Sequence, residues 1–308
     1  MTFRSHFSII MIITISNDMT ELIKAKSILS NLRGGPDPYF GLTYSMNLYR
    51  GCQHGCIYCD TRSTCYGVGD ISKIRIKENA IELLRKELSS KRKKGTIGTG
   101  SMNDPYMPIE KKTEHVRQAL ETIAEFRWPV HAMTKSSLIA RDIDLLKKID
   151  ETYAAASFSI TAYSDELARK LEPGASSTSD RFKALSKLAS DGIYTGVILT
   201  PVLPFITDNA ANLELIIRKA KDSGAEYIIS WMGMTNREGQ REHFYRELDK
   251  HFPGVREKYE KEFGMDYSCS SPNASRLYDV FHEACAKYSI TTRMRFYSPK
   301  QSEQLSLL

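Results

Sequence analysis

The strongest constraint on the fold is an alternation of strand-like and helix-like segments between residues 44 and 231. Short apolar runs typical of β-strands cover residues 44–49, 96–100, 130–133, 155–160, 197–199 and 227–229. Between these runs apolar residues recur at helical spacing, for example at Val116, Ala119, Leu120 and Ile123. Strands that alternate with helices predict an α/β fold with a parallel sheet and right-handed crossovers. Either an open doubly wound sheet or a partial barrel satisfies this pattern.

The alternation ends after Trp231 and gives way to polar, mostly helical sequence. One expected helix carries an apolar stripe formed by Leu277, Val280, Phe281, Ala284, Cys285 and Tyr288. A last strand is expected over residues 291–296. We therefore predict an N-terminal extension (1–24), a core (25–235) and a C-terminal extension that covers the core (236–308).

The N-terminal extension contains an apolar run at residues 7–15. This run is too short to span a bilayer and lacks the cleavage site of a secretory signal. Because the sequence changes character at Met19, we expect translation to start there. We expect a cytoplasmic protein without a membrane partner, and the sequence predicts no oligomeric state.

Composition excludes several classes of protein. The chain has 308 residues, of which 41% are hydrophobic and 26% are charged, so disordered, collagen-like and disulfide-miniprotein classes are excluded. The net charge of +6 is compatible with an anionic partner such as nucleic acid. The basic residues are interspersed with acidic ones, which favours an ordinary solvated surface.

The cysteines are unevenly distributed, and three of them, Cys52, Cys56 and Cys59, form a C-x3-C-x2-C array after the first expected strand. Clustered cysteines in a long chain favour a metal site in a reducing compartment. Three thiolates on one loop leave a fourth position open and suit zinc or an iron–sulfur cluster. Structural zinc needs a fourth protein ligand, which Cys65 or His54 could supply. A zinc-stabilised nucleic-acid-binding protein is therefore the alternative hypothesis.

The cysteine array, with Tyr58 just before its last ligand, resembles the signature of radical S-adenosylmethionine (SAM) enzymes. Residues 98–110, 134–142 and 166–174 are similar to segments of the spore-photolyase-like branch of that superfamily, and the resemblance covers roughly residues 25–233. It implies a partial (β/α)6 TIM-like barrel with a mostly helical C-terminal extension. It also implies that Cys52, Cys56 and Cys59 bind a 4Fe-4S cluster.

The resemblance further implies a reaction. In that superfamily SAM chelates the fourth iron, and an electron from a donor such as flavodoxin or ferredoxin leads to cleavage of SAM. The products are methionine and a 5′-deoxyadenosyl radical, which abstracts hydrogen from the substrate. The substrate contacts of true spore photolyases find no match in this sequence, so the substrate is not identified, although DNA repair of the photolyase type is one candidate.

Several residues are expected at the SAM site because they follow strands or match positions of the superfamily. Gly98, Thr99, Gly100 and Ser101 correspond to the stretch that binds the SAM amino group, where glycine permits close backbone approach. Tyr58 is expected against the adenine or the cluster. A plain βα turn and ordinary loop packing are the respective alternatives.

Charged and hydroxyl side chains after the third and fourth strands are further candidates. Lys135 and Arg169 could pair with the SAM carboxylate, and Glu172 could bind the ribose hydroxyls, so that Arg169 and Glu172 form a clamp. Ser157 could also reach the ribose from the fourth strand. Solvated helix charges and a satisfied strand serine are the alternatives.

The remaining cysteines have different expected roles. Cys65 and Cys269, the latter expected in a loop, are candidates for returning a hydrogen atom to a substrate radical, as a cysteine does in the photolyase relatives. Cys285 lies on the apolar stripe of the last helix, so we expect a small buried side chain.

Overall fold

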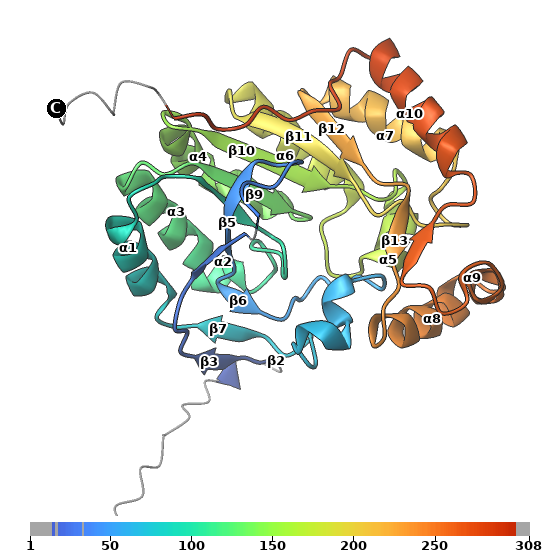
Figure 1. The fold of residues 1–308 in the computed structure, drawn as a ribbon, viewed down its shortest axis with the longest axis horizontal. Coiled ribbons are helices and arrows are strands. Elements are labelled where there is room, and N and C mark those ends of the chain that lie inside the picture. The colour runs from blue at the N-terminus through green and yellow to red at the C-terminus, as the bar shows by residue number, and fades with distance from the viewer. Residues whose placement is uncertain (1–13, 16–17, 33, 300–308) are drawn as a thin grey trace, which may run out of the picture.

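The computed structural model describes residues 14–15, 18–32 and 34–299. Its central sheet has seven strands (Figure 1). In spatial order these are β12 (Tyr227–Ser230), β11 (Tyr194–Leu199), β10 (Ala154–Ser159), β9 (Val130–Thr134), β8 (Thr96–Thr99), β5 (Leu42–Met46) and β4 (Leu29–Asn31). The first six run parallel, and β4 pairs antiparallel with β5 at the edge.

The parallel strands lie in chain order because each connection crosses back over the same face of the sheet. This arrangement confirms the predicted α/β class with the strand order of a partial barrel. The sheet stays open, since β12 and β4 are its two edges among the described strands. Most of the predicted apolar run at residues 7–15 lies outside the described residues.

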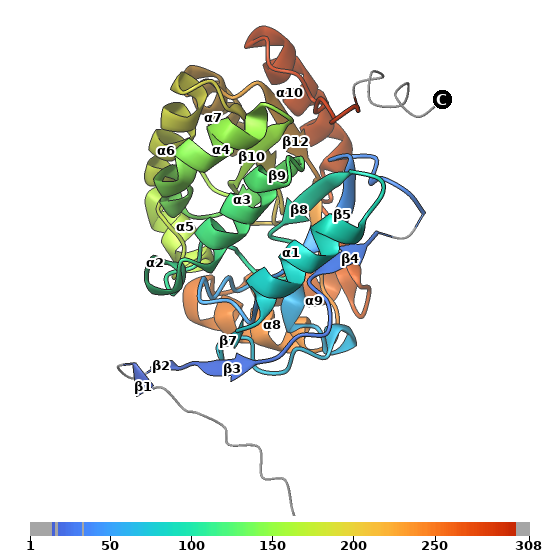
Figure 2. The same cartoon turned by 90° about the vertical axis from the view of Figure 1, so that its left-hand side faces the viewer.

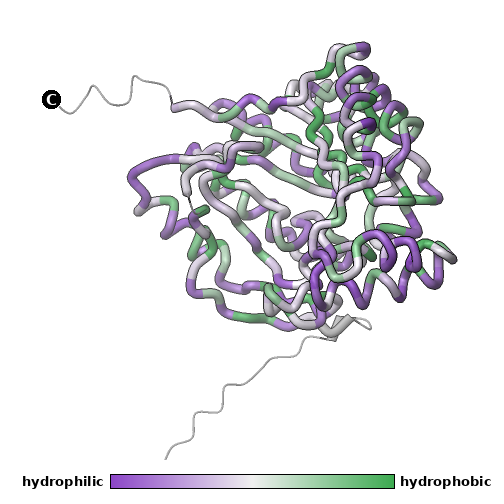
Figure 3. Tube along the Cα trace, turned by 45° about the vertical axis from the view of Figure 1, so that its right-hand side comes forward, coloured by the Kyte–Doolittle hydropathy of each residue, from purple (hydrophilic) through white to green (hydrophobic). Residues whose placement is uncertain are grey.

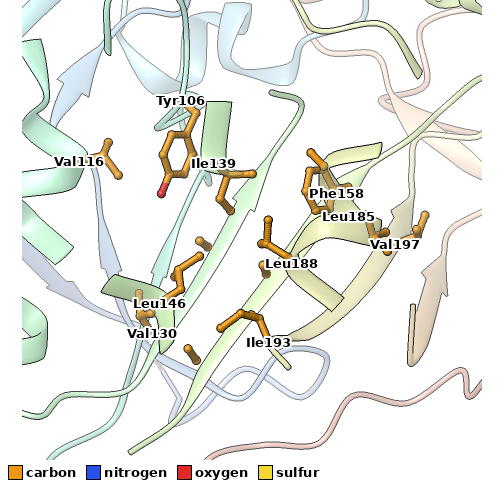
Figure 4. Close-up of a cluster of buried hydrophobic side chains, with 14 of the residues drawn as sticks. Tyr106, Val116, Val130, Ile139, Leu146, Phe158, Leu185, Leu188, Ile193 and Val197 are labelled. Atoms are coloured by element: carbon orange, nitrogen blue, oxygen red, sulfur yellow. The ribbon is translucent and has the colours of Figure 1, made fainter. Parts of the chain in front are cut away.

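Helices cover the outer face of the sheet (Figure 2). They are α1 (Ala80–Ser90), α3 (His115–Glu125), α4 (Ile143–Asp150), α6 (Thr178–Ser190), α7 (Ala210–Asp222) and α10 (Ala274–Lys287). Figure 4 shows the resulting core, in which Leu146 and Leu188 from the helices lie beside Val130 and Phe158 from the strands. The helical stripes that the sequence predicts are therefore buried as expected.

Strand β10 shows how the sheet separates its two faces. Ala156 and Phe158 pack into the helix-covered core, whereas Ala155 belongs to the cluster on the other face. Because side chains alternate along a strand, Ser157 and Ser159 lie on the same inner face as Ala155. That face is where a barrel encloses its contents.

Smaller elements complete the fold, and most of them are too short to be predicted from the sequence. The run at residues 44–49 divides into β5 and β6 (Tyr49–Arg50), and β6 belongs to a separate sheet with β3 (Glu21–Ile23) and β7 (Arg75–Lys77). The other short strands are β1 (Thr14–Ile15), β2 (Asp18–Met19), β13 (Gly233–Thr235) and β14 (Ser268–Ser270). The remaining α-helices are α2 (Glu110–Thr113), α5 (Asp165–Leu171), α8 (Gln240–His251) and α9 (Val255–Phe263). Single 3-10 segments are η1 (Asp60–Arg62), η2 (Thr64–Tyr66) and η3 (Ser137–Asp142).

The predicted last strand at residues 291–296 is wrong. This segment forms one isolated bridge, between Tyr227 and Thr291, and is otherwise irregular. It is held mainly through tyrosines of the sheet, because the Tyr153 hydroxyl donates to the Arg295 carbonyl at 2.6 Å and the Arg295 amide donates to the Tyr194 hydroxyl at 2.8 Å. The segment thus covers one end of the inner face. No helix in the described part of the chain is both long and apolar enough to cross a membrane.

Candidate functional site

A cavity of about 390 Å³ lies beyond the carboxyl ends of the parallel strands. Its walls come from the loops that follow β8, β9, β10, β11 and β12 and from the loop of residues 51–59, which we call the cysteine loop. This is the end of a parallel α/β sheet at which ligands bind. The thiols of Cys52, Cys56 and Cys59 all contribute to its lining.

The cysteine loop is fixed by backbone hydrogen bonds on both sides. The Ile57 amide donates to the Leu171 carbonyl at 2.9 Å, and the Gly174 amide donates to the His54 carbonyl at 2.8 Å. From the other side, the Gln240 side-chain amide donates to the Tyr58 carbonyl at 2.8 Å. The end of α5 and the start of α8 therefore hold the three thiols against the cavity.

Asp104 connects the cysteine loop to the loops that follow β8 and β9. Its carboxylate accepts hydrogen bonds from the Thr134 hydroxyl and the Lys135 amide, both at 2.6 Å, and lies 3.3 Å from Nδ1 of His54. Burial opposes ionisation, but His54 and these donors hold the pKa of Asp104 at about 2. The carboxylate is thus an ionised anchor in the cavity wall.

Gly100 and Ser101 line the cavity, whereas Gly98 and Thr99 lie within β8 and do not. Gly100 has a φ of 86°, and a Cβ there would overlap the carbonyl oxygen of Met133. The position therefore requires glycine. Ser101 shares a hydrogen bond of 2.8 Å with Ser45.

Tyr58 and Lys135 line the cavity together, with the Lys135 ammonium 5.9 Å from the centre of the Tyr58 ring. The Tyr58 hydroxyl donates to the buried carboxylate of Glu172, which also forms an ion pair with Arg181. Burial would lower the pKa of Lys135, but the charges of Cys56 and Glu172 outweigh burial and raise it. Lys135 therefore presents a positive charge beside Cys56.

The predicted clamp of Arg169 and Glu172 is not formed. Glu172 is 2% exposed, does not line the cavity and is engaged by Tyr58 and Arg181. Arg169 lies on the exposed side of α5 and lines a different hollow. Both residues border a small hollow beside α5, but neither lines the main cavity. Glu172 lies just past the end of α5 with its carboxylate bound to Tyr58 and Arg181, and this is the physical reason for the correction.

Ser157 also lies away from the cavity. Its hydroxyl is 2.6 Å from Nε2 of His131 and 2.6 Å from the hydroxyl of Tyr227, within a fully buried group. Ser159, two residues further along the same face of β10, lines the cavity instead. Strand periodicity thus predicts the face of the sheet on which Ser157 and Ser159 lie, but it does not predict which of the two is close enough to the end of β10 to reach the cavity.

The two cysteines proposed as hydrogen donors do not line the cavity. Cys65 is exposed, with its sulfur 3.2 Å from Ser63 Oγ and 3.3 Å from an Arg237 nitrogen. Cys269 lies in β14 rather than in a loop and is fully buried beside Met234, which is its strand partner. Cys285 is buried in the core on α10, as its place on the apolar stripe predicts.

Several cavity residues that the sequence does not predict lie after the last two parallel strands. They are Thr200, Pro201, Trp231, Met234 and Thr235. Trp231 keeps 38% of its surface exposed. The signal that could have found these residues is their position directly after β11 and β12, since loops at that edge build the site.

Residues 46–216 match the family described as the Radical SAM superfamily. The chain belongs to that superfamily. The matched stretch begins in β5, contains the three cysteines of the cavity and ends in α7.

This radical SAM protein is also similar to individual proteins, and the share of each relative that it covers varies. An uncharacterized protein of Methanocaldococcus jannaschii is 32% identical over 247 residues, which cover 79% of this chain and 87% of that protein. The Radical SAM Nalpha-GlyT isomerase of Pseudomonas phage M6 is 29% identical over 181 residues, covering 59% of this chain and 37% of that protein.

Solved spore photoproduct lyases share the fold. One mutant superposes with a TM-score of 0.68 and 15% sequence identity, covering 91% of this chain and 82% of that chain. Another, with bound AdoMet and dinucleoside spore photoproduct, superposes with a TM-score of 0.67 and 14% identity, covering 90% and 81% of the two chains.

The superfamily implies a 4Fe-4S cluster and SAM, and the donor set of the cavity fits such a cluster. In the described residues no three His, Cys, Asp or Glu side chains are arranged to hold a single metal ion. A cluster binds each thiolate through its own iron, so the sulfurs need not converge on one point. Burial and the charge of Asp104 raise the pKa of Cys52 to about 12, so thiolate formation there requires a compensating cation.

The two candidate zinc ligands of the alternative hypothesis are placed elsewhere. Cys65 points away from the cavity lining toward Ser63 and Arg237, and Nδ1 of His54 faces Asp104. Cys65 would have to leave both contacts to join the three cysteines, whereas His54 could bind a metal only through Nε2 while Nδ1 faces Asp104.

Proposed function

We propose that this protein binds a 4Fe-4S cluster through Cys52, Cys56 and Cys59 and cleaves SAM reductively in the cavity beside them. The observation that carries the proposal is that three unpaired thiols line one cavity at the carboxyl edge of the parallel sheet. When bound, the cluster and SAM supply a 5′-deoxyadenosyl radical that abstracts hydrogen from a substrate.

The other lining residues would bind and orient SAM. Lys135 lines the cavity, and we propose that its ammonium pairs with the SAM carboxylate. The backbone at Gly100 allows close approach of the SAM amino group. Tyr58 presents a ring whose hydroxyl is already anchored on Glu172, so the ring offers a fixed surface.

The substrate is proposed only as a class. Spore photoproduct lyases of the same fold have been solved with a dinucleoside spore photoproduct, which makes a nucleic-acid lesion one candidate. Salt-dependent binding of DNA or RNA would support this class, because phosphate contacts weaken as salt rises. Unpaired cysteines suit a reducing compartment, and we propose the cytoplasm.

Anaerobic reconstitution with iron and sulfide tests the function. The protein should bind iron and acid-labile sulfide and, with dithionite and SAM, should release 5′-deoxyadenosine. Cys52→Ala, Cys56→Ala and Cys59→Ala should each lose the product, because each removes one thiolate ligand. Cys285→Ala, which alters a core cysteine on α10, is the matched control and should retain it.

Two results would contradict the proposal. One is an intact iron–sulfur cluster that yields no 5′-deoxyadenosine in the wild-type protein. The other is stoichiometric zinc without iron or sulfide in anaerobically prepared protein, which would support the zinc-stabilised alternative.

A further inference from the structure

A second hollow, of about 490 Å³, lies against the opposite side of the cysteine loop. We call it the outer hollow. Its lining includes Gly55, Ile57, Arg169, His243, Glu247 and His251. Gly55 and Ile57 flank Cys56, whereas Cys56 itself lines the main cavity. The two cavities therefore adjoin the same short stretch of chain, residues 55–57.

The wall between the cavities is packed and rigid. Cys56, Ile57 and Tyr58 form a buried cluster with residues of α5 and α8, among them Leu171 and Phe244. The hydrogen bonds from Ile57 to Leu171 and from Gln240 to Tyr58 hold the loop between the two helices. A group bound by Cys56 would thus be separated from the outer hollow by this stretch of backbone.

Uncompensated charge around the outer hollow is positive. Its two carboxylates are already paired, Glu166 with Lys170 at 3.1 Å and Glu247 with Lys250 at 2.8 Å. In contrast, Arg169 forms no ion pair with any described residue.

The surroundings of His243 add to this positive character. Neither Arg62 nor Arg246 forms an ion pair within the described part of the chain, and both act on His243. Burial and the charges of Arg62 and Arg246 lower the pKa of His243 to about 4. Hydrophilic residues dominate the neighbouring helices α8 and α9, at the lower right of Figure 3, which is the character of a solvated surface.

We propose that the outer hollow is the docking site of an acidic one-electron donor protein of the flavodoxin class. The proposal rests on the proposed function, because a reducible group held by Cys56 needs an electron from outside. An acidic donor would place carboxylates against Arg169 and Arg246 while its redox group approaches Ile57. The donor would lose one electron, the group held by the thiols would gain it, and no atom would be transferred.

The test measures binding and turnover separately. Fluorescence anisotropy gives the dissociation constant of labelled flavodoxin for the reconstituted protein, at low and high salt. Turnover is measured as 5′-deoxyadenosine released with either flavodoxin hydroquinone or dithionite as reductant. In the double variant Arg169→Glu, Arg246→Glu, flavodoxin affinity and flavodoxin-driven turnover should both fall roughly tenfold or more, because like charges now face the donor. Dithionite-driven turnover should stay unchanged.

The matched control is Arg276→Glu, a charge reversal of an exposed arginine that forms no ion pair with a described residue. It lies on α10, which packs against α7 at the upper right of Figure 1, whereas α8 is at the lower right. This control should leave both flavodoxin readouts unchanged. The proposal is overturned if the double variant keeps wild-type affinity, or if wild-type protein is reduced by dithionite but not by flavodoxin. A dimer of the protein that the double variant dissociates would also overturn it, by assigning the hollow to a second copy. Failure of dithionite-driven turnover in wild-type protein would instead contradict the proposed function.

Discussion

At the scale of single residues, the site depends on positions whose backbone or burial admits few substitutes. Gly100 has a positive φ, and the carbonyl oxygen of Met133 occupies the space that a Cβ at this position would need. Asp104 accepts hydrogen bonds from the adjacent Thr134 and Lys135 and also faces His54 of the cysteine loop. Neither constraint is visible in the sequence, because each arises from a neighbour about thirty residues away along the chain.

Gly100→Ala and Gly192→Ala form a matched pair. Both glycines have a positive φ, of 86° and 84°, but a Cβ at Gly192 meets nothing within 4 Å. Gly192→Ala should therefore lower the free energy of unfolding by about 1 kcal/mol, the usual cost of the conformation. Gly100→Ala should lower it further and weaken SAM binding measured by calorimetry. Equal stability and equal SAM affinity in the two variants would show that Met133 does not constrain the loop.

His131 gives the protein a pH dependence that does not involve the cavity lining. Its ring is fully buried, and burial lowers its pKa from 6.5 to about 3. Below pH 6.5 the imidazole of His131 is protonated in the unfolded chain but not in the folded chain. The contribution of His131 to the free energy of unfolding is therefore fully present above pH 6.5 and is lost as the pH falls toward 3.

This loss amounts to about 2 kcal/mol between pH 7 and pH 5. Urea unfolding at both pH values should show that the stability difference between wild type and His131→Gln shrinks by about that amount at pH 5. A pH-independent difference for His131→Gln would mean that the buried imidazole is protonated in the folded protein.

At the scale of elements, the long periodic segments were predictable and the short ones were not. The helix around Val116 and Ile123 and the strand around Phe158 can be predicted from the sequence, because the spacing of their apolar residues matches the positions that are buried. By contrast, β13 and β14 have three residues each and depend on a partner about 35 positions away. The segment at residues 291–296 is predicted as a strand, but beyond its one bridge at Thr291 it is held by hydrogen bonds with the hydroxyls of Tyr153 and Tyr194.

The same distinction applies to the site. The C-x3-C-x2-C spacing is local, so the cysteine loop could be found from sequence. The pairing of Glu172 with Arg181 depends on how α6 packs beside the end of α5, and the burial of Ser157 depends on His131 and Tyr227 from two other strands. Contacts between elements decide these outcomes, and one sequence does not specify them.

At the scale of the whole molecule, the described buried residues form a main core, a small cluster on the inner face of the sheet and a second core near the site. The main core joins the sheet to its helices, while the second contains Cys56 and Tyr58 together with Phe244, Leu248 and Tyr259 of the C-terminal region. We propose that residues 236–308 cover the core of residues 25–235, with α8 and α9 joined to it through this second core and α10 through the main core. The cysteine loop would then be a structural centre as well as a binding loop.

This arrangement predicts how loss of iron affects the fold. Removing the cluster with a chelator leaves three thiols, of which burial disfavours the thiolates of Cys52 and Cys56, and the loop loses the group that fixes it. Hydrogen exchange followed by mass spectrometry should then rise in α5, α8 and α9, which pack on the loop, and should stay constant in α6 and α7, which belong to the main core. Cys56→Ala without chelator should reproduce the pattern, while Cys285→Ala should not. A uniform rise across both cores would show that the two unfold as one unit and that the cysteine loop has no separate role in holding the C-terminal helices.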